Sequence, residues 1–143
     1  MVTGARSLAA LALCALALAG CGRADFDEDV PLSRIEQALE AEGVAVCASE
    51  PTEARTPGAV AETRLDVARD CADPEPTDAV VVVTTFDDAG DRDAAAGRFE
   101  VAARPVGAGA VWTLGPHLVR VSGDRDPETS DRIADALDGL GAR

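Results

Sequence analysis

Apolar and polar residues recur along the chain with two different periods, which predicts a mixture of helices and strands. Within residues 32–42, apolar side chains recur every three or four positions, and Ser33 with Glu36 has the spacing of a capping box, so a helix is expected there. Residues 79–86 contain four consecutive valines and two threonines. An unbroken apolar run of this kind predicts a central strand that is buried on both faces.

The rest of the chain shows weaker patterns of the same two kinds. Residues 59–70 alternate between charged and apolar positions, which favours a strand, although a helical stripe also fits them. Residues 48–58 carry prolines, Ser, Thr and Gly and are expected to form a loop. Further strands are expected at 44–47, 110–114 and 117–122, and Gly115-Pro116 joins the last two as a hairpin. Further helices are expected at about 91–101 and from Pro127 onward, the last one capped by Asp126 and ended by Gly139 and Gly141.

Helices interspersed with short strands indicate an α+β fold. We expect a two-layer sandwich in which two to three helices cover a mainly antiparallel sheet of four to five strands. The chain has 143 residues, which is enough for one domain with one core, and this domain is expected to occupy residues 31–143.

The N-terminal residues have the organisation of an export signal. A short cationic start precedes an apolar run at residues 8–19, which is too short to cross about 30 Å of hydrocarbon as a helix and fits the core of a secretory signal. The end of this run resembles the lipobox of bacterial lipoprotein precursors, through Leu18-Ala19-Gly20-Cys21. The resemblance implies that residues 1–20 are removed and that Cys21 is acylated, so that its acyl chains hold the protein in the lipid bilayer on the extracytoplasmic face of the cell membrane. The alternative is a plain secretory signal with a chance cysteine.

The charge of the chain narrows the choice of partners. All 26 acidic residues follow residue 20, as do 12 of the 13 basic residues, so the mature net charge is about −14. Nucleic acid is therefore not expected as a partner, because its phosphates would be repelled. Residues 21–30 are especially acidic and are expected to form a tether between the anchor and the domain.

Two cysteines, Cys47 and Cys71, remain in the predicted domain. An even pair in an exported chain is most simply a disulfide. A redox pair or a set of metal ligands is the alternative, but the spacing is not CxxC and no His lies nearby in the sequence.

Few residues have a pattern typical of a catalytic or metal site. The turn at Asp87, Asp88, Asp91 and Asp93 is a weak candidate for calcium, because carboxylate oxygens bind this ion. Its spacing departs from an EF-hand, and carboxylates that favour the positive end of a helix are the preferred interpretation. The single histidine, His117, lies outside any known nucleophile motif and is expected as a partly exposed strand end.

Trp112 is the only tryptophan, and there is no tyrosine. It is expected to pack under a helix, with an exposed anchor for a partner as the weaker alternative. We therefore expect a membrane-anchored envelope lipoprotein that acts as a non-catalytic binding or scaffolding module, without a cofactor and with an envelope protein as partner. The alternatives are a small-ligand or calcium-binding lipoprotein and, as the third choice, an envelope hydrolase that uses His117.

Overall fold

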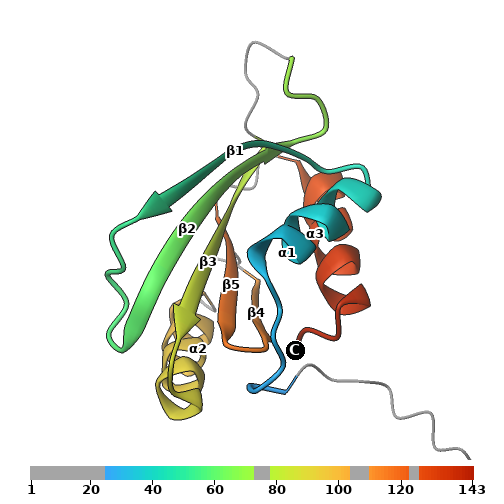
Figure 1. Cartoon of the computed structure of the whole chain (residues 1–143). Coiled ribbons are helices and arrows are strands. Elements are labelled where there is room, and N and C mark those ends of the chain that lie inside the picture. The colour runs from blue at the N-terminus through green and yellow to red at the C-terminus, as the bar shows by residue number, and fades with distance from the viewer. Residues whose placement is uncertain (1–24, 73–77, 104–109, 123–125) are drawn as a thin grey trace, which may run out of the picture.

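A computed structural model describes residues 25–72, 78–103, 110–122 and 126–143 (Figure 1). The predicted signal peptide and Cys21 lie outside these residues. The elements in chain order are α1 (Leu32–Ala41), β1 (Ala45–Thr52), β2 (Ala59–Ala68), β3 (Ala79–Phe86), α2 (Ala89–Ala103), β4 (Val111–Leu114), β5 (His117–Ser122) and α3 (Pro127–Gly139).

The five strands form one sheet in the order β1-β2-β3-β5-β4, and each neighbouring pair is antiparallel. The predicted α+β fold is confirmed. The valine-rich strand β3 is central, as expected, and Val81 lies opposite Leu65 of β2 on one side and Val121 of β5 on the other. The expected hairpin of β4 and β5 is also present.

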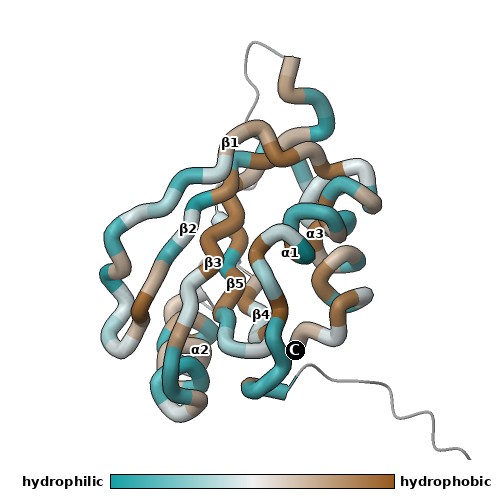
Figure 2. The backbone as a smooth tube through the Cα atoms, in the orientation of Figure 1, coloured by the Kyte–Doolittle hydropathy of each residue, from teal (hydrophilic) through white to brown (hydrophobic). Residues whose placement is uncertain are grey.

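Helices α1 and α3 pack side by side over one face of the sheet (Figure 1). Ile35 of α1 and Ile133 of α3 are fully buried in the core, together with Leu65 and Val81 of the sheet. Figure 2 shows the apolar character concentrated in the central strands, in agreement with burial of β3. Burial of this apolar face against two helices is the main source of stability for the domain.

Helix α2 lies on the opposite face of the sheet and covers only part of it. Successive residues of a strand point to opposite faces, so Leu118 and Phe86 lie on the side away from α1 and α3. These two side chains are buried against Ala95 of α2, and Phe99 packs beside them. Among the described residues, no helix covers the rest of this second face, which is hollowed over the strands and beside α2.

Strand β1 is longer than the strand expected at 44–47, and the loop expected at 48–58 was wrong in its first part. The reason is that β1 is an edge strand, and proline is tolerated at a sheet edge, where its missing N–H is not needed for a ladder. Pro51 lies in β1 opposite Thr63 of β2. The strand preferred for residues 59–70 is confirmed as β2.

The start of α1 differs from the expected capping box. Pro31 occupies the N-cap position and makes no side-chain capping hydrogen bond, so Ser33 lies inside the first turn. Glu36 instead accepts a hydrogen bond from the Ser49 hydroxyl of β1, at 2.9 Å. The pattern was correct about the helix and wrong about which residue caps it.

The disulfide expected between Cys47 and Cys71 is present, with a Cα–Cα distance of 5.3 Å. It joins β1 to the segment that follows β2, at the end of the sheet remote from α2 (Figure 1). In the chain-entropy description, a loop of this length contributes roughly 3 kcal/mol to stability.

The described part of the expected tether, residues 25–30, lies against the domain, and we call it the N-terminal clasp. Val30 is buried in the core, and Phe26 packs beside the α2 cluster with its ring 5.2 Å from the Arg92 guanidinium carbon. Phe26 and Val30 fix the clasp because they are the apolar positions in an otherwise acidic stretch. The clasp runs beside the C-terminus, where Arg143 pairs with Asp25 at 3.4 Å.

Candidate functional site

His117 is the first residue of β5, as expected, but it is buried and not partly exposed. Its Nε2 lies 2.6 Å from the carbonyl oxygen of Val30, and its Nδ1 lies 3.0 Å from the Thr85 hydroxyl. A carbonyl oxygen only accepts, so Nε2 carries the proton and donates it, and in the neutral ring Nδ1 accepts from Thr85. His117 thus fixes the end of the clasp to the sheet.

Burial lowers the pKa of His117, although the hydrogen bond to Val30 and the charge of Asp29 oppose this effect. Burial therefore favours the neutral ring, in which Nε2 donates to Val30 and Nδ1 accepts from Thr85. A hydroxyl that donates to an imidazole also occurs in nucleophilic sites, where a carboxylate orients the ring. Here a backbone carbonyl takes that position, and His117 and Thr85 line neither of the two hollows described below.

The acidic turn before α2 contains the calcium candidates. The Asp88 carboxylate accepts a hydrogen bond from the backbone N–H of Asp91 at 3.0 Å, which is a helix-capping contact. Asp93 pairs with Arg92 at 2.7 Å, and Asp87 is exposed. Among the described residues no group of three or more His, Cys, Asp or Glu side chains is arranged to hold a metal ion.

Trp112 lies in β4 opposite Val119 of β5. It is partly buried against the core between the sheet and helices α1 and α3. The expectation that it packs under a helix matches this position.

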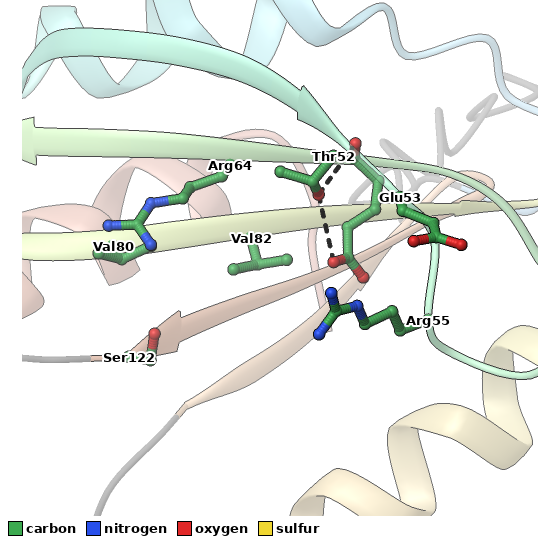
Figure 3. Close-up of a pocket in the computed structure, with 8 residues that line it drawn as sticks. Thr52, Glu53, Arg55, Arg64, Val80, Val82 and Ser122 are labelled. Atoms are coloured by element: carbon green, nitrogen blue, oxygen red, sulfur yellow. Dashed lines mark hydrogen bonds between the residues drawn. The ribbon is translucent and has the colours of Figure 1, made fainter.

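The open part of the second sheet face is hollowed beside strands β1, β2 and β3 (Figure 3). This sheet hollow has a volume of about 330 Å³. Val80 and Val82 form part of its floor, and Arg64 lies opposite Val82 on the neighbouring strand. Its other lining residues include Thr52, Glu53, Arg55, Glu62 and Ser122.

A second hollow of about 490 Å³ adjoins the first, between α2 and the loop that joins β1 to β2. This helix hollow shares Arg55 and Glu62 with the sheet hollow. Its walls are Phe99 and Ala102 of α2 and Pro57 of the loop, and its cations are Arg55, Arg98 and Arg120. Pocket volumes of about 300–1,000 Å³ are usual for small-molecule sites.

Glu62 and Arg120 form the polar centre of the helix hollow. Their side chains are 14% and 25% exposed, and Arg120 Nη2 lies 3.6 Å from Glu62 Oε2. Glu62 also accepts hydrogen bonds from the hydroxyls of Thr84, at 3.2 Å, and Thr52, at 3.4 Å. Its carboxylate is therefore fixed by three neighbours from three strands.

Arg120 is less well satisfied. Its guanidinium carbon lies 4.0 Å from the centre of the Phe99 ring, which is a cation–π contact. Its buried Nε has no hydrogen-bond partner in the described part of the chain. Burial lowers the pKa of Arg120, and the charge of Glu62 opposes this effect. An unpartnered buried donor costs roughly 1–3 kcal/mol, so this position is costly for the fold.

The sequence alone does not predict the helix hollow. Its arginines come from the β1–β2 loop, α2 and β5, so no local spacing brings them together. One signal was visible: Arg120 interrupts the apolar run of residues 118–121, which otherwise predicts a buried strand. A charged residue at such a position is unusual without a partner.

No protein-family model, curated protein or solved structure matches this chain. No helix within the described ranges is long and apolar enough to cross a membrane.

Proposed function

We propose that the protein is an exported lipoprotein, anchored through acylated Cys21, whose domain is a non-catalytic binding module. Its binding surface is the open part of the second sheet face, with the sheet hollow and the helix hollow. The observation that carries this proposal is the composition of the helix hollow: three arginines and one glutamate surround it in a chain with a net charge of −13. Arginines gathered against the overall charge favour a binding role for this surface.

The N-terminal clasp supports attachment close to the bilayer. Cys21 and Asp25 are four residues apart, so their Cα atoms are at most about 14 Å from each other. The clasp is fixed to the domain by Phe26, Val30 and the carbonyl bound by His117. An acyl anchor at Cys21 would therefore hold the domain beside the membrane.

The anchor is tested by the intact mass of the protein extracted from its native membrane. The expected mass is that of residues 21–143 plus acyl groups, and the Cys21→Ser variant should carry no acyl mass and leave the membrane fraction. A wild-type protein that is recovered without acyl groups from the culture fluid would contradict the anchor.

The binding surface is tested by placing a photoreactive amino acid at Glu53, which is exposed and lines the sheet hollow. The matched control is Gln37, an exposed polar residue of α1 on the other side of the molecule. After irradiation of intact cells, a mass adduct is expected at Glu53 and not at Gln37. Equal adducts at both positions would contradict selective binding by this face, and no adduct at either would contradict binding in the sheet hollow.

A further inference from the structure

We infer that the helix hollow binds a small amphipathic carboxylate, with its apolar part between Phe99 and Pro57 and its carboxylate among the three arginines. This inference rests on the proposed binding function and names the class of ligand. The lining of the hollow combines apolar side chains with arginines that are incompletely paired.

The arginines provide more positive charge than the hollow neutralises. Glu62 is the only acidic residue among the described residues that line the helix hollow. Arg55 and Arg98 are exposed and have no ion-pair partner within the described part of the chain. Arg120 contacts Glu62 at 3.6 Å, which is longer than a hydrogen bond, and its Nε is unpartnered. A second carboxylate would accept hydrogen bonds from the exposed guanidinium groups of Arg55 and Arg98, because guanidinium groups bind carboxylates through paired N–H donors.

The apolar walls of the hollow favour a ligand that has an apolar part. Phe99 is partly buried under the Arg120 guanidinium, and Ala102 and Pro57 are exposed at the opening. The volume of about 490 Å³ is sufficient for a small molecule. Contact with these side chains would remove apolar surface from water on both partners.

The charge of the whole chain favours a monoanion over an acidic protein segment. A net charge of −13 repels a multiply charged partner during approach, and this repulsion grows with the charge of the partner. A ligand with one carboxylate is repelled least by the net charge of the protein, and physiological salt screens this repulsion beyond about 8 Å. Within this distance, the three arginines of the helix hollow attract the ligand carboxylate.

The test uses residues 21–143 with Cys21→Ser, which keeps every described residue and prevents acylation. The probes are decanoate and decan-1-ol, which share the same chain and differ in the charged head group. Binding is followed by nitrogen–proton correlation spectra, with shifts expected at the amides of Glu62, Phe99 and Arg120. Decanoate is expected to bind about tenfold more tightly than decan-1-ol, the effect of one charge-assisted contact.

Single substitutions test whether the arginines of the hollow, and not the net charge of the protein, bind the carboxylate. Arg98→Gln and Arg55→Gln are each expected to weaken decanoate binding about three- to tenfold and to leave decan-1-ol binding unchanged. The matched control is Arg34→Gln, which removes one positive charge from the exposed side of α1 and should change neither affinity.

The outcomes distinguish this inference from the proposed function. Equal binding of decanoate and decan-1-ol in the helix hollow would overturn recognition of a carboxylate and leave a binding module. Binding of neither probe, with an adduct at Glu53 in cells, would overturn the ligand class and point to a macromolecular partner. Binding of neither probe, without an adduct at Glu53, would overturn both.

Discussion

His117 links the stability of the domain to pH, because burial of its side chain favours the neutral ring over the charged one. Burial lowers its pKa in the folded protein, whereas in the unfolded chain the pKa is about 6.5. Between these two values the unfolded chain binds more protons than the folded protein. The contribution of His117 is therefore complete above about pH 6.5 and is lost as the pH falls toward the folded pKa.

The slope of this loss is set by one proton, so it is at most about 1.4 kcal/mol per pH unit. The variant His117→Gln removes the titrating group and keeps an amide that can donate to Val30. At pH 7.5 we expect the variant to be less stable by about 1–2 kcal/mol, because the hydrogen bond with Thr85 and the ring packing are lost. The difference between wild type and variant should then shrink as the pH falls below 6.5.

Urea denaturation between pH 7.5 and 5.0 measures this difference, with the fluorescence of the single, partly buried Trp112 as the signal. The carboxylates titrate in both proteins, so their effect cancels when the two free energies of unfolding are subtracted. Parallel curves for wild type and variant across this range would refute the assignment of the neutral, buried ring to His117.

Two further predictions concern the clasp and the disulfide. Gly115 has φ +54°, and a Cβ there would lie 2.7 Å from the carbonyl oxygen of Glu28, so Gly115→Ala should lower the free energy of unfolding by about 2 kcal/mol or more. The control Gly139→Ala meets no atom within 4 Å and should be neutral or stabilising, and equal urea midpoints for the two variants would contradict the close approach of the clasp. Replacing Cys47 and Cys71 together by Ser should cost roughly 3 kcal/mol in the same assay, and an unchanged midpoint would show that the bridge does not constrain the unfolded chain.

Much of the fold could be predicted because the core elements carry long, consistent patterns. The apolar run of β3 and the period of α1 both depend on local sequence, and the structure places both elements where they were expected. The edge strand β1 was predicted too short, because Ser49 and Pro51 are typical of loops and only the sheet position makes them acceptable. The clasp was predicted as a free tether, because two apolar residues among acidic ones carry no periodic signal.

The candidate site depends on long-range contacts and could not be predicted in the same way. Arg55, Arg98 and Arg120 are separated by at least twenty residues from one another and meet only because α2 crosses the second face of the sheet. His117 was correctly expected at a strand end, but its burial depends on the clasp that covers it. Local pattern therefore determines which elements form, whereas tertiary packing determines which of their side chains meet.

Glu62 determines how strongly the helix hollow can attract a second carboxylate. It is the internal partner of Arg120, and its charge repels a ligand carboxylate in the same hollow. At a separation of roughly 6 Å, this repulsion amounts to about 0.7–3 kcal/mol for an effective dielectric constant between about 80 and 20. The variant Glu62→Gln should therefore bind decanoate about three- to 100-fold more tightly.

The same substitution should weaken the fold, because Arg120 loses its only ion-pair partner among the described residues. Opposite effects on affinity and stability are the signature of a residue that competes with the ligand for Arg120. The control Glu40→Gln removes an equal charge from the exposed side of α1 and should change neither quantity. If Glu62→Gln lowered stability without tightening decanoate binding, the glutamate would be a structural counterion alone and the ligand carboxylate would not lie beside Arg120.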